Sequence, residues 1–411
     1  MVSLQTMTTS NKRKIINDPV YGFINIPSEE IYDLIQSPYV QRLRRIKQLG
    51  LSNLVYPGAE HTRFSHSVGA MHLMTQALEV LANKGETISD KEYSASLQAI
   101  LLHDIGHAPF SHCLENFFFN TSHEQISLQF MKDLQVDETV TKIFEDKYSK
   151  KFLHELVSSQ VDTDRLDYLT RDSFFTGVSE GVIGTERILK MFSVYEDELV
   201  IDEKGIYSIE KFIISRRLMY WQVYMHKTVV GADCLLQNLL KRARFLAQND
   251  ALLEKEFPIT NHLFYFLKNG IREINDKEAL NHYMLLDDTD IWSCVKVWTA
   301  HKDKILSLLA NKLANREIGH LEIKTSPFSN EELQQKYDKL YKEFNVAFSR
   351  DEVENYFCSS NELHNKAYSF DDRQINILFK NGQIKEIYEA SDQLDKNFLS
   401  KEIKKYYYFQ I

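Results

Sequence analysis

The segment HDIGHAPFSH, residues 103–112, marks the point where a long apolar helical pattern stops. A capping box that begins at Ser89 predicts the start of this helix, and Gly106 is the residue that would end it. In the middle of a helix, the side chains of His103 and Asp104 would point about 100° apart. At a frayed helix end both can turn to the same side. The segment therefore predicts a fold whose helices stop where they present polar side chains together.

The scarcity of glycine and proline extends this helical interpretation to the whole chain. The 411 residues include 14 glycines and 7 prolines, where average usage would give about 7% and about 5%. Both residues interrupt regular structure, so we expect long elements rather than a small β-sandwich or a loop-rich scaffold. Because 43% of the residues are hydrophobic, the chain can bury a large core, which excludes the disordered and collagenous classes.

The net charge and the spacing of the cysteines indicate which partners and which cellular compartment to expect. The 49 basic and 58 acidic residues give a net charge of −9. This argues against a general nucleic-acid-binding protein, because phosphate contacts drive that affinity. The four cysteines form no CxxC pair, so neither a disulfide framework nor a zinc ribbon is indicated. No run approaches the roughly 18 apolar residues of a membrane span. We expect a soluble protein of the reducing cytoplasm.

Local signals divide the chain into predicted elements and domains. Alternation over 14–27 predicts a hairpin. Helices are predicted from Ser28, from Ser37-Pro38 to Gly50, from Ser65 to Gly85, from Ser122 with a second capping box, and over 151–173 and 208–248. Strands are predicted at 317–324, 374–379 and 404–409, among helices near 331–343 and 393–400. We expect a mainly α protein with an N-terminal tail (1–13), a helical domain (14–255) and a smaller C-terminal mixed α/β lobe (256–411).

Four polar segments carry the candidate ligands, and the first three of them lie near the ends of predicted helices. They are His61-Thr62-Arg63-Phe64-Ser65-His66, the segment 103–112, His123-Glu124, and Asp162-Thr163-Asp164-Arg165-Leu166-Asp167-Tyr168. Imidazole nitrogens with carboxylate oxygens suit Mn, Fe, Co, Ni or Zn, and carboxylate-rich variants also accept Mg. A histidine at one helix start, the His-Asp pair at another helix end and a distant aspartate predict a divalent metal site. Such a metal would polarise a phosphoryl oxygen and lower the pKa of a bound water.

Further imidazoles and two arginines surround the candidate ligands. His107, His112 and His123 exceed what one metal needs, and they suit acid–base work or phosphate contact near neutral pH. Arg63 and Arg165 stand close in sequence to candidate ligands and offer the planar forks that grip phosphate. An acidic protein can bind a polyanionic substrate if its cations gather in one such pocket.

Some residues have a simpler interpretation. Asp167 and Arg171 are spaced i,i+4 and can be explained as a helix-surface pair. The run Phe117-Phe118-Phe119 is interpreted as core rather than as a platform for stacking bases, and His72 as a core or surface histidine rather than a ligand.

Taken together, these residues resemble the HD superfamily of metal-dependent phosphohydrolases, whose pattern is H…HD…D. His66, His103-Asp104 and Asp164 match it in order. The closer resemblance is to the deoxynucleoside triphosphate triphosphohydrolases, the branch that includes the sterile-alpha-motif HD-domain enzyme. The matching stretches are NDPVYGFI, QRLRRIKQLG, YPGAEHTRFSHSVG, HDIGHAPFSH, SHEQIS, VDTDRLDYLTRD and YMHKTV, which extend over roughly residues 14–235.

The resemblance implies metal-dependent hydrolysis of a dNTP to the deoxynucleoside and tripolyphosphate. The metal ligands it implies are His66, His103, Asp104 and Asp164. His123, oriented by Glu124, would be the acid for the departing 5′ oxygen, with His107 beside the phosphates. The substrate contacts it implies are Gln48, Leu49, Arg63, His112, Arg165, Tyr168, Asp172 and Tyr224. Tyr224 would crowd the 2′ position and so exclude ribonucleotides.

Activated relatives bind a second set of nucleotides between subunits. Lys14, Gln41, Arg44 and Lys227 stand at positions that match this regulatory region. The resemblance therefore implies a homo-oligomer (a dimer or a tetramer) and an activating nucleotide. Gln36 stands where the guanine-reading acidic residue would be expected, which argues against dGTP as an obligatory activator.

Two other functions remain open at this point. The protein could be an HD-type nucleotidase or phosphodiesterase that acts on another nucleotide, and the identity of the products would separate these activities. It could also be a nucleotide-sensing regulatory protein, whose mark would be a broken set of metal ligands; here the set is intact.

Overall fold

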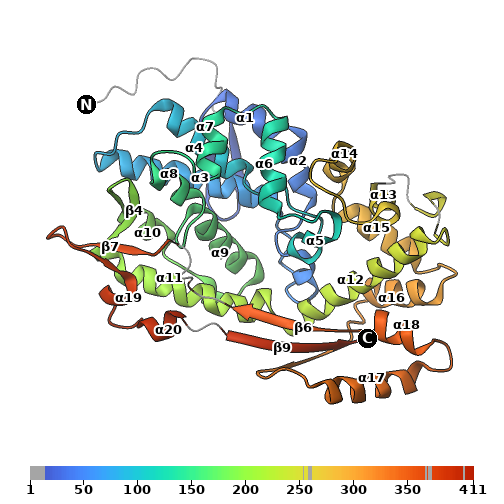
Figure 1. The fold of residues 1–411 in the computed structure, drawn as a ribbon. Coiled ribbons are helices and arrows are strands. Elements are labelled where there is room, and N and C mark those ends of the chain that lie inside the picture. Colours follow the sequence, from blue (N-terminus) through green and yellow to red (C-terminus); the bar gives the residue numbers. More distant parts are fainter. Residues whose placement is uncertain (1–13, 253, 258–261, 366–367, 369–372, 401–402) are drawn as a thin grey trace.

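The structure, a computed structural model, describes residues 14–252, 254–257, 262–365, 368, 373–400 and 403–411. The predicted N-terminal tail (1–13) lies outside the described residues. The protein is mainly α-helical, with small sheets of two, four and three strands (Figure 1), so the predicted fold class is confirmed. Among the residues that the structure describes, no helix is both long enough and apolar enough to cross a membrane.

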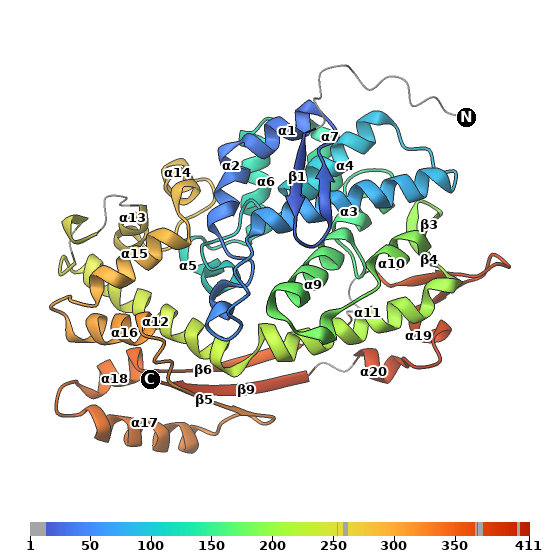
Figure 2. The same ribbon diagram turned by 180° about the vertical axis from the view of Figure 1, so that it is seen from behind.

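Two long helices, α3 (Arg63–Asn83) and α9 (Thr163–Thr176), pack against each other in the N-terminal part of the chain. Around them lie α1 (Glu29–Gln36), α2 (Pro38–Arg42), α4 (Asp90–Leu102), α5 (Glu115–Phe118), α6 (His123–Asp133), α7 (Glu138–Phe144), α8 (Lys151–Val157) and α10 (Thr185–Met191). The helices α11 (Ile206–Met219) and α12 (Lys227–Gln248) follow one another along one side of this body (Figure 2).

Several predicted element starts are confirmed because their signals are local. Strands β1 (Ile15–Asp18) and β2 (Gly22–Asn25) form the predicted antiparallel hairpin. The hydroxyl of Ser28 accepts a hydrogen bond from a backbone N–H in the first turn of α1, and that of Ser37 does the same for α2, whose first residue is Pro38. Both bonds of the capping box between Ser89 and Glu92 are present at the start of α4.

Three predicted helices are too long. The helix predicted from Ser37-Pro38 to Gly50 ends at Arg42 and tightens into a 3₁₀ turn, η1 (Leu43–Arg45). The segment 151–173 contains two helices, α8 and α9, because the Asp162 carboxylate caps a new helix by accepting from the backbone N–H of Arg165 at 2.6 Å. The segment 208–248 is interrupted by a π-turn, η6 (Tyr220–Tyr224), between α11 and α12.

The second predicted capping box is also wrong. Helix α6 begins directly after Ser122, but the Ser122 side chain makes no capping hydrogen bond. The free backbone N–H of His123 instead donates to the carboxylate of Glu115 at 3.3 Å. A carboxylate from a neighbouring element thus takes the place of the local cap.

Two sheets contain the strands of the C-terminal part. In the first, the order is β3 (Phe192–Tyr195), β4 (Glu198–Asp202), β7 (Asn376–Leu378), β8 (Ile384–Glu386), with β4 and β7 parallel and the outer pairs antiparallel. In the second, β9 (Ile403–Gln410) lies between β5 (His320–Lys324) and β6 (Cys358–Asn365), all antiparallel. The strands predicted at 317–324, 374–379 and 404–409 are confirmed, whereas β3, β4, β6 and β8 were not predicted.

Further helices accompany these sheets. They are α13 (His262–Asn269), α14 (Lys277–Leu285), α15 (Asp288–Trp298), α16 (Lys304–Ala314), α17 (Asn330–Phe344), α18 (Arg350–Tyr356), α19 (Ile387–Ala390) and α20 (Lys396–Ser400). Helix α12 contacts α13, α16 and β5, and the orange and red strands β6 and β9 run alongside it (Figure 1). The domain boundary at residue 255 stays a prediction; the parallel pairing of β4 with β7 joins strands from both sides of it.

Candidate active site

Four polar side chains from three elements converge at the predicted metal site. His66 comes from the first turn of α3, His103 and Asp104 from the turn after α4, and Asp164 from the first turn of α9. His66 Nε2 lies 3.3 Å from His103 Nε2 and 3.0 Å from an oxygen of Asp164. Asp104 places one oxygen 3.6 Å from His66 Nε2 and the other 3.2 Å from His103 Nε2. The end of α4 before His103 lets both residues of the pair face this point, as the sequence predicts.

Hydrogen bonds behind the two imidazoles determine which nitrogens face inward with a lone pair. His103 Nδ1 lies 2.6 Å from the carbonyl oxygen of Ile100, which can only accept. His66 Nδ1 lies 2.8 Å from an oxygen of Asp167 and donates to that carboxylate. Both Nε2 atoms are then free to bind a cation, and carboxylate oxygens surround them. This donor set fits a divalent metal ion of the kinds that the sequence predicts.

The electrostatic environment of His66 also favours a bound cation. Burial lowers the pKa of His66, but hydrogen bonds with Asp164 and Asp167 outweigh it and raise this pKa to about 10. Burial would raise the pKa of Asp104, yet His103 and other neighbouring cations hold it well below its usual range. A field that binds a proton this strongly at His66 also favours a metal cation.

Asp167 connects this site to the packing of α3 against α9. Its two oxygens accept hydrogen bonds from Arg171 at 2.9 and 3.0 Å, and Arg171 also binds Asp18 at 2.8 Å. Asp167 and Arg171 are completely buried, so their interpretation as a helix-surface pair is wrong. Gly69 of α3 makes room for them: an added Cβ would lie 2.1 Å from Asp167 and 2.2 Å from Arg171.

Three histidines and Glu115 form a second cluster beside the metal site. Nitrogens of His107, His112 and His123 lie within 4.8 Å of one another, and the rings of His107 and His123 lie 3.8 Å apart. Glu115 accepts hydrogen bonds from Nδ1 of both His112 and His123, and these bonds hold the pKa of Glu115 well below its usual range. Glu124 is half exposed and lies 3.4 Å from the other nitrogen of His123, Nε2. Glu115 therefore occupies the orienting position for which the sequence suggested Glu124.

Two arginines line the same region. Arg63 donates from Nε to the hydroxyl of Ser111 at 2.8 Å and binds Asp104 through its guanidinium group. Burial and the charge of Arg63 hold the pKa of His107 well below its usual range, so His107 is neutral near pH 7. Its Nε2 atom is buried and has no hydrogen-bond partner among the described residues. Arg165 lies beside Asp164, with part of its side chain exposed to the site.

Tyr168, Asp172 and Tyr224 form another wall. The Tyr224 hydroxyl donates to Asp172 at 2.8 Å, and His61 Nε2 lies 2.7 Å from the other oxygen of Asp172. Burial raises the pKa of Tyr168 to about 12, so its hydroxyl stays protonated. No role was predicted for His61, although it stands in the histidine-rich segment before α3.

One cavity of about 360 Å³ joins these groups. All eight predicted substrate contacts line it, namely Gln48, Leu49, Arg63, His112, Arg165, Tyr168, Asp172 and Tyr224. Asp104, Asp164, His107 and His123 line it as well, whereas His66 and His103 are buried behind its surface. Residues without a predicted role also line it, including Cys113, Val229 and Asp233.

Residues far along the chain hold the segment 103–112 in place. The buried Arg42 guanidinium donates at 2.8 Å to the carbonyl oxygens of both His107 and Leu286. The hydroxyl of Tyr283 donates to the carbonyl oxygen of Gly106 at 2.9 Å. These contacts join residues separated by 65 to 244 positions. No local pattern in the sequence predicts them.

Asp288, the first residue of α15, joins two segments that line the cavity. Its carboxylate accepts hydrogen bonds from the backbone N–H of Lys47 at 2.9 Å and of Phe110 at 2.7 Å. Burial raises the pKa of Asp288 to about 6, although these two backbone donors lower it in part. The segment that carries Gln48 and Leu49 is thereby fixed against the histidine-rich turn.

The four residues predicted to bind a regulatory nucleotide lie outside this cavity. Lys14 Nζ lies 3.0 Å from the centre of a tyrosine ring and 2.8 Å from a glutamate oxygen of α1. Arg44 stands 3.5 Å over a phenylalanine ring of α3 and donates to Gln41 at 3.0 Å. Lys227 is the exposed first residue of α12, and Gln36 is the exposed last residue of α1.

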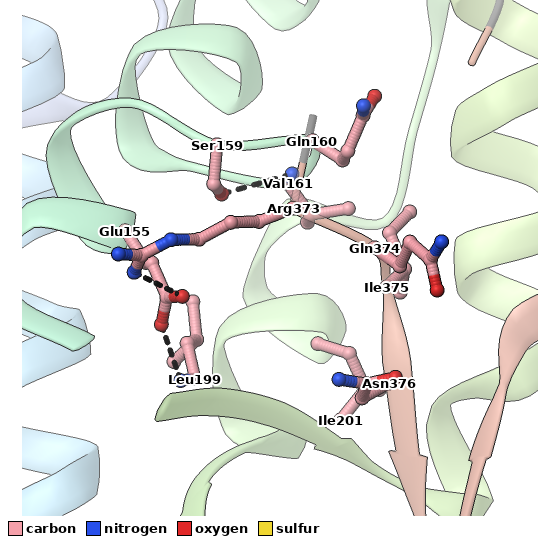
Figure 3. A pocket seen from close by; sticks show the side chains of 10 residues that line it. All are labelled: Glu155, Ser159, Gln160, Val161, Leu199, Ile201, Arg373, Gln374, Ile375 and Asn376. Atoms are coloured by element: carbon pink, nitrogen blue, oxygen red, sulfur yellow. Dashed lines mark hydrogen bonds and ion pairs between the residues drawn. The ribbon is translucent and has the colours of Figure 1, made fainter. Parts of the chain in front are cut away.

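A smaller cavity of about 20 Å³ lies beside the loop between α8 and α9 (Figure 3). Arg373 extends across it toward Glu155 of α8 and also binds Asp146 at 2.8 Å. In the same loop, the carbonyl oxygen of Ser159 accepts a hydrogen bond from Arg165 Nε. The chain before β7 thus packs against the loop that leads to Asp164 and Arg165.

Two family models match this chain. The HD domain model matches residues 63–172, and the HD associated region model matches residues 183–255. The first match contains all four candidate metal ligands.

Relatives extend the likeness over nearly the whole chain. The crystal structure of a phosphohydrolase from Bacteroides thetaiotaomicron VPI-5482 superposes with a TM-score of 0.91 at 47% identity, covering 97% of this chain and 100% of that one. The uncharacterized protein YwfO of Bacillus subtilis (strain 168) is 34% identical over 399 residues, 93% of this chain and 88% of YwfO. The SAMHD1 homolog of Dictyostelium discoideum, a deoxynucleoside triphosphate triphosphohydrolase, is 31% identical over 271 residues, 59% of this chain and 52% of that protein. This chain therefore belongs to the HD-domain family of phosphohydrolases, within which it resembles the deoxynucleoside triphosphate triphosphohydrolase branch.

Proposed function

We propose that this protein hydrolyses deoxynucleoside triphosphates to the deoxynucleoside and tripolyphosphate, with a divalent metal ion (Mn, Mg, Fe, Co, Ni or Zn) held by His66, His103, Asp104 and Asp164. One observation carries the proposal. A cavity large enough for a nucleotide joins a His/Asp cation site to a histidine–glutamate cluster and to a wall of Tyr and Asp hydroxyl-binding groups. The relatives described as deoxynucleoside triphosphate triphosphohydrolases support the same substrate.

The phosphates would lie between the metal site and the arginines. When bound, the cation supplies a Lewis acid that polarises a phosphoryl oxygen and activates water. Arg63, held by Ser111 and Asp104, would present its guanidinium group to phosphate oxygens, and Arg165 would do so from the start of α9. His107 would lie beside the phosphates; because its Nδ1 faces two acceptor oxygens of Asp104, the neutral ring presents Nε2 as an acceptor, without adding a charge.

His123 is suited to give a proton to the departing 5′ oxygen. Its Nδ1 donates to Glu115, which leaves Nε2 to hold and release the transferred proton. Glu115 is ionised and holds the ring of His123 in place through this bond. Glu124, 3.4 Å from Nε2, stands near the nitrogen that would face the substrate.

The sugar would lie against the tyrosine wall. Asp172, held by His61 and Tyr224, would accept a hydrogen bond from the 3′-hydroxyl, together with Tyr168. The ring of Tyr224 would leave no space for a 2′-hydroxyl and so exclude ribonucleotides. Gln48 and Leu49 would contact the sugar and the base.

Product analysis tests this proposal directly. The protein is incubated with each dNTP and rNTP, singly and in pairs, with Mg, Mn or Co, and the products are identified. We expect deoxynucleoside and tripolyphosphate, and a loss of about 10³-fold or more in Asp104→Ala and His66→Ala. His72→Gln, on the same helix as His66 but outside the site, is the matched control and should keep its activity. Retained activity in both site variants would contradict the proposal, and orthophosphate or pyrophosphate as product would indicate an HD-type nucleotidase or phosphodiesterase instead.

We also propose a cytoplasmic homo-oligomer, a dimer or tetramer, whose activity responds to nucleotides bound by Lys14, Gln41, Arg44 and Lys227. Lys14, Arg44 and Lys227 are cations outside the catalytic cavity, which suits them to bind further phosphates. Light scattering with and without nucleotides measures the assembly. Turnover that occurs only with mixed dNTPs would support activation, whereas full turnover of each dNTP alone would exclude an obligatory second nucleotide.

A further inference from the structure

The catalytic cavity reaches the first turns of α12, where an acidic side chain has no assigned role. Val229 and Asp233 lie one helical turn apart on the same face of α12, and both line the cavity. Gln237, one turn further, donates its amide to the carbonyl oxygen of Cys113 at 2.8 Å. Cys113 Sγ in turn lies 3.8 Å from the carbonyl oxygen of Asp233. This face of α12 is therefore fixed against η3 (Ser111–Leu114).

The carboxylate of Asp233 can accept hydrogen bonds, but it has few donors nearby in the protein. Within the described part of the chain, no basic side chain forms an ion pair with its carboxylate, and its side-chain partner is the thiol of Cys113, a weak donor. Burial raises the pKa of Asp233 to about 7, and the bond with Cys113 offsets this only in part. An ionised carboxylate in such surroundings is stabilised when a ligand brings N–H donors to it.

A second acceptor belongs to the same part of the cavity. The side-chain oxygen of Gln48 is buried and has no hydrogen-bond partner among the described residues. The segment that carries it lies against η3, because the Ser111 hydroxyl donates to the carbonyl oxygen of Lys47 at 2.8 Å. Gln48 and Asp233 thus approach the cavity from two elements that both contact η3, and their oxygens require donors from whatever binds there.

The four bases differ in the donors they can bring. Guanine presents two adjacent donors, N1–H and the N2 amino group, which match the two oxygens of one carboxylate. Adenine and cytosine place one amino group beside a ring nitrogen that only accepts. Thymine places one N–H between two carbonyl oxygens, which a carboxylate repels. We propose that Asp233 reads the Watson–Crick edge of guanine, so that the protein prefers guanine deoxynucleotides; this inference rests on the proposed function.

Competition among the four dNTPs in one mixture measures this preference, because any activation by a nucleotide affects the turnover of all four alike. Equimolar dGTP, dATP, dCTP and dTTP react in one mixture at about pH 8, where the carboxyl of Asp233 is ionised, and the four deoxynucleoside products are quantified. Their initial ratios give the ratios of kcat/KM, because all four substrates meet the same enzyme state. We expect deoxyguanosine to exceed thymidine by about 10-fold or more in the wild-type protein. In Asp233→Asn this ratio should fall to within about 3-fold, because the amide has one acceptor where the carboxylate has two.

Gln237→Ala is the matched control, because it loosens the same contact between α12 and η3 without altering the lining of the cavity. It should keep the wild-type product ratio. A second comparison changes the substrate: dITP lacks the N2 amino group of dGTP, so the wild-type protein should prefer dGTP over dITP by about 10-fold, and Asp233→Asn should not distinguish them. This wild-type comparison decides the inference even if Asp233→Asn does not fold.

Three results would overturn the inference. They are equal wild-type turnover of dGTP and dITP, a guanine preference that Asp233→Asn leaves unchanged, and equal loss of the preference in Gln237→Ala. Each of these leaves dNTP hydrolysis, and so the proposed function, intact. Failure to hydrolyse any dNTP in the mixture would instead overturn both together.

Discussion

Among the single residues of the site, Glu115 combines two tasks in one carboxylate. It holds His112 and His123 through their Nδ1 atoms, and it also accepts from the backbone N–H of His123 at the start of α6. The pKa of Glu115 lies well below its usual range because of these hydrogen bonds. The side chain is therefore a permanent negative charge beside the proposed proton donor.

Replacing Glu115 by Gln should remove the charge and keep the shape. We expect kcat to fall by about 10²- to 10³-fold, because the ring of His123 loses the charged acceptor that orients its Nδ1. Bound metal, measured by elemental analysis, should stay unchanged, since Glu115 contacts none of the four candidate ligands in the described structure.

Glu124→Gln is the matched comparison for this prediction. Glu124 is half exposed and has only the longer contact of 3.4 Å to His123, so its loss should cost less activity than that of Glu115. If Glu124→Gln lowered kcat more than Glu115→Gln did, the orienting role would belong to Glu124.

At the scale of elements, the sequence predicts where helices begin better than where they break. The caps at Ser28, Ser37 and Ser89 act within three residues and can be read locally. The segment 151–173 contains no glycine or proline to mark a break, and the capping role of Asp162 at the start of α9 was missed. Strands β3, β4, β6 and β8 were missed because short strands gain their stability from partners; β4 pairs with β3 in a local hairpin and with β7 about 175 residues later.

In the candidate site too, local motifs could be recognised in the sequence, whereas contacts between distant segments could not. The candidate metal ligands and substrate contacts stand out in the sequence because their residue types are crowded into a few motifs, and the structure brings them together in or directly behind one cavity. Glu115, Arg42 and Asp288 were missed because they act through contacts between distant segments. Glu115 carried a weak signal, since it is an acidic residue three positions after His112.

The packing of α3 on α9 at Gly69 can be tested with one methyl group. In Gly69→Ala, the added Cβ would overlap Asp167 and Arg171, so the helices must separate. We expect the free energy of unfolding to fall by about 3 kcal/mol, because a buried ion pair is disturbed in a tightly packed region. Metal affinity should fall by about 10-fold to 100-fold, because Asp167 orients His66.

Urea unfolding of Gly69→Ala measures the change in unfolding free energy, and metal titration measures the change in metal affinity. Gly184→Ala is a suitable control, because a Cβ there would meet its nearest neighbour, Arg187, only at an ordinary contact distance of 3.9 Å. Its stability should stay within about 1 kcal/mol of the wild type. Unchanged metal affinity in a folded Gly69→Ala protein would show that Asp167 is not needed to orient His66.

At the scale of the whole molecule, the C-terminal half supports the catalytic half. Arg42 reaches Leu286, Asp288 binds the backbone on two sides of the cavity, and β7 extends the sheet begun by β3 and β4. The site is therefore built on contacts that cross the predicted boundary at residue 255.

Asp288 makes this support dependent on pH. Its pKa of about 6 in the folded protein lies above the value of about 4 expected in the unfolded chain. Its contribution to stability is therefore fully present below about pH 4 and is lost as the pH rises through about 6, where the buried carboxyl ionises. Asp288→Asn copies the neutral acid and does not ionise. The stability of the variant relative to the wild type should rise by at most about 3 kcal/mol between pH 4 and pH 7.

Urea unfolding of both proteins at several pH values tests this prediction. Other titrating groups are common to both proteins and cancel in the difference between them. A difference in unfolding free energy that is constant from pH 4 to pH 7 would mean that folding does not raise the pKa of Asp288.

The contact of Arg42 with Leu286, 244 residues apart, also has a consequence for biosynthesis. A ribosome produces the histidine-rich turn long before it produces the segment that fixes that turn. Until residues 283–288 leave the exit tunnel, the nascent chain holds the candidate metal ligands without the backbone contacts that align them. Hydrolytic activity should therefore appear late in translation, after this segment has left the ribosome.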